Sequence, residues 1–89
     1  MRFTWNETKR KSNLKKHRLD FADGPRAFNG PTLTEEDRRP YQGEQRFNTM
    51  GLLGVAVVVI CHTETGDEIH IISMREAENH ETRKFFSYL

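Results

Sequence analysis

Several basic side chains of this sequence have the chemistry that cleaves RNA without a metal ion. With one acid beside them, the candidates are Lys9, Lys16, His17, Glu44, Arg46 and Arg75. In such a cleavage the 2′-OH attacks the adjacent phosphorus, a base and an acid move protons, and cations stabilise the added negative charge. Arginine binds phosphate through paired hydrogen bonds, and histidine gains and loses a proton near neutral pH.

An alternative stays open, and the residue types alone favour it. In this alternative Arg46 and Arg75 are structural and form ion pairs with carboxylates. Glu44 and Glu81 are examples of carboxylates that could form these pairs.

The four histidines are scattered along the chain, at His17, His62, His70 and His80. A three-residue turn makes His62 and His70 face each other across a hairpin, whereas a register shift of one residue puts them on opposite faces. No Asp or Glu stands at a convincing ligand spacing, so we expect no metal and no other cofactor. A metal-dependent hydrolase built on the histidines is a third, less favoured hypothesis.

The net charge of +1 hides a strongly basic N-terminal segment. Residues 1–18 contain seven Lys and Arg against one acid, whereas residues 19–38 contain two against five. A basic segment on a nearly neutral chain favours a polyanionic partner, most often nucleic acid. A basic helix face that is merely solvated is an equally acceptable interpretation.

Composition limits the class of protein. The 89 residues are expected to form one domain, 1–89, and an apolar fraction of 35% predicts a thin core. The longest apolar stretch, 51–61, is too short to cross a bilayer, and the basic polar start excludes a signal peptide. A single cysteine, Cys61, cannot form an internal disulfide, so we expect a buried, inert thiol in a cytoplasmic protein.

The first helix is predicted over 6–18, with Asn6 as its N-cap and Leu14 as its main core residue. Helical spacing places one set of polar residues on a single face: Lys9, Asn13, Lys16 and His17. We interpret that face as a binding face rather than a core face.

The remaining pattern predicts an α+β domain, because the helices are segregated from a run of antiparallel strands. In chain order the elements are a helix from Gly24 to Gly30, an edge strand over 32–34, an exposed loop over 35–43, strands over 45–50, 55–62 and 68–74, a tight turn over 65–67 and a terminal helix over 75–88. The residues assigned to the core or to helix–sheet packing are Phe3, Val57, Val59, Ile71 and Ala77.

Three groups of residues, in this order and spacing, resemble the BrnT family of toxins from bacterial type II toxin–antitoxin modules. They are K-x-x-x-N-x-x-K-H over 9–17, G-E-x-R over 43–46 and I-I-S-x-R-x-A over 71–77. The likeness runs from Phe3 to about Phe85 and includes Arg39, Pro40 and Tyr41. Four positions depart from the usual family residue: Asn6 for Asp, Arg18 for Gly, His70 for Arg and Phe85 for Tyr.

The resemblance implies a RelE-like fold, in which N-terminal helices and a C-terminal helix pack on an antiparallel sheet of about four strands whose open face forms the active cleft. It implies a metal-independent endoribonuclease that inhibits translation. The implied partner is a cognate antitoxin with a ribbon-helix-helix DNA-binding region, which neutralises the toxin and represses the operon together with it. Operator DNA is then bound only through that complex. The alternative is a non-catalytic small basic module that binds RNA or protein.

The resemblance also assigns roles position by position. Arg46 and Arg75 contact the phosphate and stabilise the transition state, and His17 is the general acid or base. Glu44 orients Arg46 or acts as a base. The expected RNA-backbone contacts are Lys9 and Lys16, with His62 and His70 as second choices.

Overall fold

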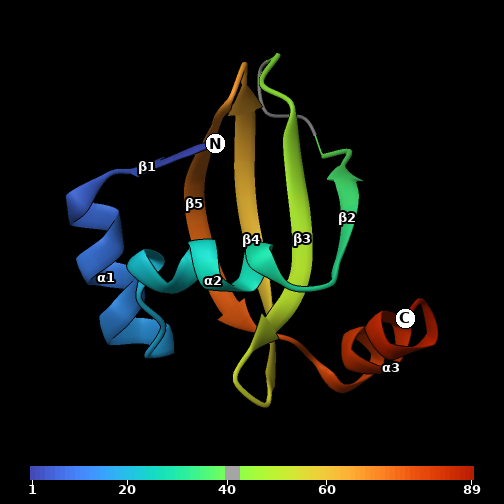
Figure 1. The fold of residues 1–89 in the computed structure, drawn as a ribbon. Coiled ribbons are helices and arrows are strands. Elements are labelled where there is room, and N and C mark those ends of the chain that lie inside the picture. The colour runs from blue at the N-terminus through green and yellow to red at the C-terminus, as the bar shows by residue number, and fades with distance from the viewer. Residues whose placement is uncertain (40–42) are drawn as a thin grey trace.

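The computed structural model describes residues 1–39 and 43–89, and its elements are shown in Figure 1. In chain order they are β1 (Arg2–Trp5), α1 (Glu7–His17), a 3₁₀ turn (Phe21–Asp23), α2 (Gly24–Asn29), β2 (Thr32–Asp37), β3 (Arg46–Leu53), β4 (Ala56–Thr65), β5 (Glu68–Glu76) and α3 (Asn79–Ser87). The predicted α+β class is confirmed. Pro40 and Tyr41, which the family resemblance includes, lie outside the described residues, as does part of the predicted loop.

All five strands belong to one sheet with the order β1-β5-β4-β3-β2. The pairs β2–β3, β3–β4 and β4–β5 are antiparallel, as predicted, whereas β1 pairs with β5 in parallel. The four predicted antiparallel strands are present, and the prediction did not include β1. Strand β1 has only four residues, which is too few for a recognisable alternation of apolar and polar residues. Its pairing partners, such as Ile69 opposite Phe3, are distant in the sequence.

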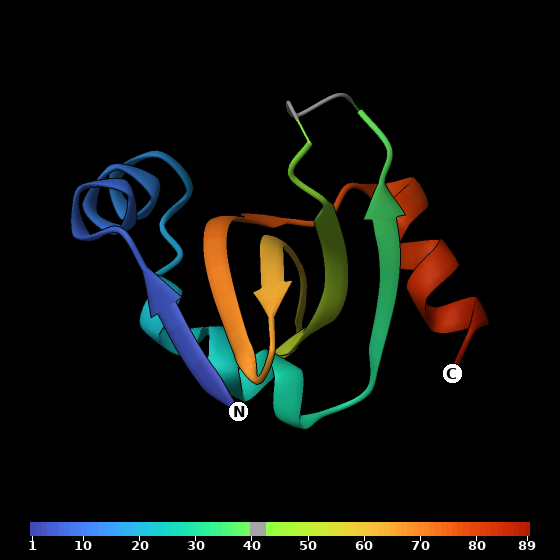
Figure 2. The same cartoon turned by 90° about the horizontal axis from the view of Figure 1, so that it is seen from above.

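The side chains of the sheet alternate between two faces, which we name after the helix that covers each. On the α2 face one buried cluster consists of Phe21, Ala27, Val58, Ile60, Ile69, Ile71 and Met74. On the α3 face a second cluster consists of Met50, Val57, Val59 and Phe85. Figure 2 shows α2 and α3 on opposite sides of the sheet. The predicted core residues are confirmed, with Phe3 and Ala77 packed at the margins of the clusters.

The C-terminal helix begins later than predicted. Arg75 and Glu76 still belong to β5, because Glu76 pairs with Val58 of the neighbouring strand. Helix α3 starts after Glu78, whose side chain forms a reciprocal capping box with Glu81. Strand β2 likewise continues to Asp37, into the segment predicted as loop.

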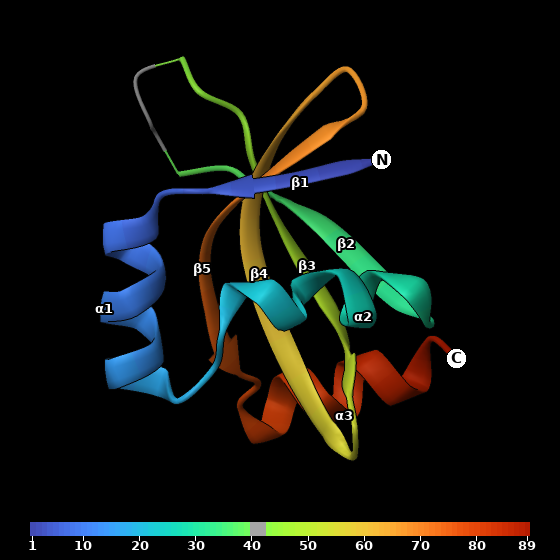
Figure 3. The ribbon, with the colours of Figure 1, turned by 60° about the vertical axis from the view of Figure 1, so that its left-hand side comes forward.

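Helix α1 lies beside the sheet at the edge of β5, as Figure 3 shows from the side. Its N-cap is Asn6, as predicted, and its C-cap is Arg18 in the left-handed conformation, with φ of 61°. The residue that points inward is Asn13, which is 8% exposed, and the prediction that Leu14 is the core residue is wrong because Leu14 is 39% exposed.

Asn13 explains why a helix with almost no apolar face stays attached to the sheet. Its side-chain amide donates to the carbonyl of Met74 at 2.9 Å and accepts from the Met74 N–H at 3.2 Å. These bonds satisfy the β5 edge beyond the point where β1 ends, at the pair Trp5–Ile71. Asn13 is therefore an anchor, so the face that it shares with Lys9, Lys16 and His17 also attaches the helix to the sheet.

No helix in the described part of the chain combines the length and the apolar character that crossing a bilayer requires.

Candidate nucleic-acid interface

A groove of about 200 Å³ separates α1 from the outer part of β5, and we call it the basic groove. Its lining residues are Lys9, Ser12, Asn13, Lys16, His17, Ile72 and Ser73. The groove brings together three of the predicted site residues, Lys9, Lys16 and His17. Sequence reasoning missed Ser12 and Ser73, although Ser12 lies three residues after Lys9 and Ser73 is the serine of the I-I-S motif.

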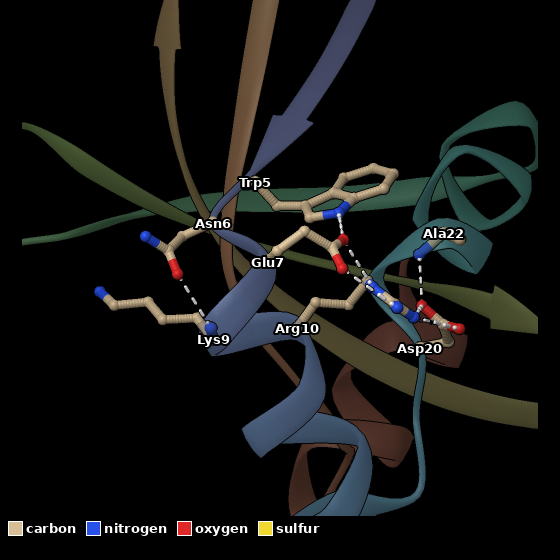
Figure 4. A network of polar contacts seen from close by, with 7 residues as sticks. All are labelled: Trp5, Asn6, Glu7, Lys9, Arg10, Asp20 and Ala22. Atoms are coloured by element: carbon tan, nitrogen blue, oxygen red, sulfur yellow. Dashed lines mark hydrogen bonds and ion pairs between the residues drawn. The ribbon is translucent and has the colours of Figure 1, made fainter.

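Arg10, one of the cations of α1, belongs to a network of ion pairs at the start of this helix (Figure 4). The network fixes the rotation of the helix. Arg10 donates to Glu7 at 2.8 Å and to Asp20 at 3.0 and 3.2 Å, and Trp5 donates to Glu7 at 3.0 Å. The Arg10 hydrogen bond lowers the pKa of Glu7, and the Ala22 backbone N–H, with Arg10, lowers the pKa of Asp20. Lys9 extends to the other side of the helix, away from this network.

The other cations of α1 and its C-cap form no ion pair with a carboxylate of the described residues. Side chains without any hydrogen bond or ion pair to residues 1–39 and 43–89 are Lys9, Lys11, Lys15, Lys16, His17 and Arg18. Arg2 and Arg10 are paired internally, whereas these other cations of the basic N-terminal segment present their charge to the surroundings. A surface of this kind attracts polyanions.

The two predicted catalytic arginines lie on the α3 face of the sheet, and each is held by a carboxylate. Arg46 Nε donates to Glu44 Oε1 at 2.7 Å, and Arg75 forms two bonds to Glu81, at 2.7 and 2.9 Å. These contacts are the ones that the structural alternative expects. The first is also the contact by which Glu44 would orient Arg46.

The register of strands β3, β4 and β5 shows how Arg46 and Arg75 are placed relative to each other. Arg75 lies opposite Val59, whereas Arg46 lies two strands away and four residues further along the sheet. Between them runs a row of smaller side chains on the same face, formed by Asn48, Cys61 and Ser73. Because Ser73 also lines the basic groove, this row connects the groove to the surface between the arginines.

The pair of Arg75 and Glu81 is the strongest electrostatic contact of this region. The Arg75 hydrogen bond lowers the pKa of Glu81 from 4.5 to about 2, and Glu81 in turn raises the pKa of Arg75. Glu81 Oε1 also accepts the Glu78 N–H at 2.9 Å, so the same carboxylate holds Arg75 and starts α3. Arg75 is still 39% exposed, which leaves it accessible to a ligand.

A second groove, of about 360 Å³, opens on the α3 face and has the opposite charge, so we call it the acidic groove. Its lining residues are Glu35, Glu36, Asp37, Arg38, Asn48, Met50, Val59 and Glu81. The sequence analysis placed most of these acids in an exposed loop and did not anticipate the groove. They gather because β2 runs alongside β3 opposite the start of α3.

His62 lies in the core of the α2 face rather than on a surface that RNA reaches. Its ring is fully buried between Phe28 and Phe47, with Nε2 2.7 Å from the Thr49 hydroxyl. Burial lowers the pKa of His62, which favours the neutral ring. We therefore leave His62 out of the proposed RNA contacts.

His70 does not face His62, so the hairpin register predicted for a three-residue turn is wrong. The loop contains only Gly66 and Asp67, since Thr65 pairs with Glu68, and His70 pairs with Thr63. Gly66 has φ of 59°, as the first position of a type II′ turn requires. His70 lies on the α3 face with Nδ1 2.9 Å from the Thr4 hydroxyl.

Cys61 is half-buried on the α3 face, which is less than the predicted burial, and desolvation raises the pKa of its thiol. Within the described ranges, no group of three or more His, Cys, Asp and Glu side chains lies close enough together to hold a metal ion.

Comparison with known proteins identifies the family. A family profile described as "Ribonuclease toxin, BrnT, of type II toxin-antitoxin system" matches residues 5–81, which include the basic groove and both arginines. A comparison with curated proteins gives no match. Because the profile covers most of the chain, this protein belongs to the BrnT family of ribonuclease toxins of type II toxin–antitoxin systems.

Proposed function

We propose that this toxin cleaves RNA without a metal ion, by attack of a 2′-OH on the adjacent phosphorus, and thereby inhibits translation. The observation that supports it most is the basic groove, where Lys9, Lys16 and His17 lie together without a carboxylate among the lining residues. Two ammonium groups attract the RNA backbone, and an imidazole beside them supplies a group able to move a proton.

In this proposal RNA lies over the α3 face between the basic groove and Arg46. Lys9, Lys16 and His70 contact the backbone, and His17 is the general acid or base. Arg46, oriented by Glu44, and Arg75 stabilise the negative charge that develops on the phosphate.

The bond to Glu81 is compatible with this role of Arg75. A guanidinium has five N–H donors in a planar fork, and Glu81 takes one from each terminal nitrogen. A third N–H, on Nη1, donates to the Glu76 carbonyl at 3.4 Å. The other two donors are available to a phosphate while Glu81 keeps the side chain in position, which lowers the entropic cost of ordering it.

The proposed partner is a cognate antitoxin with a ribbon-helix-helix DNA-binding region, acting in the cytoplasm. It neutralises the toxin, and the complex, not the toxin alone, binds operator DNA and represses the operon. We expect the antitoxin to raise the melting temperature of the toxin, because a ligand that binds only the folded state stabilises it. Tight binding without a rise would contradict this expectation.

One observation favours a second candidate function, a non-catalytic module that binds RNA or protein. Both arginines already have carboxylate partners, so each has a structural role whether or not it acts on RNA. In that case the basic groove binds a ligand but the protein performs no chemistry on it.

The deciding experiment is cleavage of a labelled single-stranded RNA by the purified toxin, with and without EDTA. Wild type, Arg75→Ala and the control Arg83→Ala, an exposed arginine of α3 outside both grooves, are compared after their melting temperatures are measured. Cleavage that survives EDTA, persists in Arg83→Ala and disappears in a folded Arg75→Ala supports the proposal. Loss of cleavage with EDTA would contradict the metal-free mechanism, and RNA binding without cleavage would support the second candidate.

A further inference from the structure

The basic groove contains two hydroxyl groups that have no role in the function proposed above. Ser12 on α1 and Ser73 on β5 both line it, and neither side chain bonds to any of the described residues. On α1, Lys9 lies one turn before Ser12 and Lys16 lies one turn after Ser12. A set of two neutral donors between two ammonium groups, with no carboxylate in the lining, matches the acceptor oxygens of a phosphate.

A bulge in β5 explains why Ser73 lies in the groove. Cys61 pairs with Ser73 and His62 pairs with Ile71, so Ile72 has no opposite residue on β4. The extra residue shifts the alternation, which puts Ser73 on the α3 face although Ile71, two positions earlier, lies on the α2 face. Bulges are common next to active sites, where they redirect a side chain in this way.

The basic groove begins where the pairing of β1 with β5 ends. Strand β1 ends opposite Ile71, and beyond it the side chain of Asn13 bonds to the backbone of Met74 on β5. The volume of about 200 Å³ is several times the roughly 30 Å³ of a liquid water molecule, so a phosphate and part of its ribose fit.

We propose that Ser12 and Ser73, with Lys9 and Lys16, form a subsite for one phosphodiester group of the bound RNA. This inference rests on the proposed function, which supplies RNA as the ligand, and it adds two positioning residues to it. Since Ser73 precedes Arg75 by two positions on the same strand face, a phosphate held here places the neighbouring nucleotide over the row that leads to the arginines.

The test uses a fluorescent single-stranded 2′-O-methyl RNA, which has no 2′-OH to attack and so reports binding alone. Its dissociation constant is measured over a series of KCl concentrations for wild type, Ser12→Ala/Ser73→Ala, Lys9→Met and Ser87→Ala. Ser87 is the matched control because its hydroxyl bonds to the Lys84 carbonyl on α3. Melting temperatures confirm that each variant is folded.

Hydrogen bonds from the serines and charged contacts from the lysines affect the salt dependence of RNA binding differently. The double serine variant should bind about tenfold more weakly with an unchanged slope of log K against log salt, since it removes hydrogen bonds but no charge. Lys9→Met should reduce that slope by about 0.7, as expected for one phosphate contact on a single strand. Ser87→Ala should match wild type, and Ser12→Ala/Ser73→Thr, which restores one hydroxyl, should recover part of the affinity.

The outcomes separate this subsite from the proposed function. If wild type binds and cleaves RNA but the double serine variant binds it within twofold of wild type, the subsite is wrong and the function stands. If wild type neither binds nor cleaves RNA, the function itself is wrong and the subsite falls with it. Tighter binding of duplex DNA than of RNA would assign the groove to DNA and overturn the inference.

Discussion

The two grooves of this toxin differ in what their charges are used for. In the acidic groove most carboxylates already have partners, with Glu35 bonded to Lys84, Asp37 to Arg39 and Glu81 to Arg75. In the basic groove Lys9 and Lys16 have none among the described residues. Charges that are paired within the fold hold elements together, whereas unpaired charges of one sign recruit a ligand of the other.

The same contrast distinguishes neighbouring cations on one helix. Arg10 is fixed by Glu7 and Asp20 and orients α1, while Lys9, one residue earlier, points away from that network. Net charge alone does not separate these two roles. The four predictions that follow test the contrast between the grooves, in order of expected size.

The basic groove depends on the anchor that holds α1. Replacing Asn13 with Ala removes its amide and leaves the Met74 N–H and carbonyl without partners. We expect the free energy of unfolding to fall by about 2–4 kcal/mol, the cost of two or more buried hydrogen bonds. Urea denaturation measures this change, with Lys11→Ala as the exposed control on the same helix. A loss below about 1 kcal/mol would mean that other contacts hold the helix.

Charge reversal tests whether position or net charge decides RNA binding. Lys9→Glu/Lys16→Glu should weaken RNA binding about 100-fold, or about 2.7 kcal/mol, because both contacts become repulsive. Lys11→Glu/Lys15→Glu changes the net charge equally on the opposite side of α1 and should lower affinity less than fivefold. Equal losses in a fluorescence anisotropy titration would show that only the overall charge matters.

Glu81 links the acidic groove to Arg75, and its contribution to the stability of the fold depends on pH. Its pKa in the folded state, about 2, lies below the unfolded value of 4.5, so it stabilises the fold fully above pH 4.5. That contribution is lost as the pH falls from 4.5 toward 2. At pH 7, Glu81→Gln should lower stability by about 2 kcal/mol, allowing for its partial exposure.

Unfolding curves between pH 7 and pH 2.5 check this dependence. Wild type should lose stability more steeply than Glu81→Gln below pH 4.5, while Glu76→Gln, an exposed control on β5, should follow wild type. Parallel curves for wild type and Glu81→Gln would contradict the assignment of this titration to Glu81.

The smallest effect is expected at the rim of the acidic groove. Glu35 and Lys84 approach to 2.6 Å, but both side chains are nearly half exposed. Solvent screening and side-chain entropy leave such an exposed pair with little net contribution to stability. Glu35→Gln should therefore leave the midpoint of urea denaturation almost unchanged, and a clear fall of the midpoint would place this groove among the main stabilising contacts.

The sequence by itself determined the features that depend on local chemistry. Asn6 caps α1 because its side chain suits an N-cap, Pro25 opens α2, and the β-branched run of β4 is buried on both faces. The helical spacing of Lys9, Lys16 and His17 correctly placed them together. The order and spacing of the motifs also carry the likeness to the BrnT family.

Tertiary structure decided the features that depend on pairing between distant segments. Strand β1 forms because its backbone pairs with the distant strand β5. The single-residue bulge at Ile72 sets which face of the sheet Ser73 occupies. His62 was a second choice for an RNA contact and lies in the core, because alternation along β4 puts it on the face of Val58 and Ile60. His70 lies on the other face, because the turn has one residue fewer than predicted. Asn13 became an anchor, and Ser12 and Ser73 became neighbours, only when α1 met the free edge of β5. Alternation and helical periodicity describe each element alone, whereas register and packing fix which side chains of different elements meet.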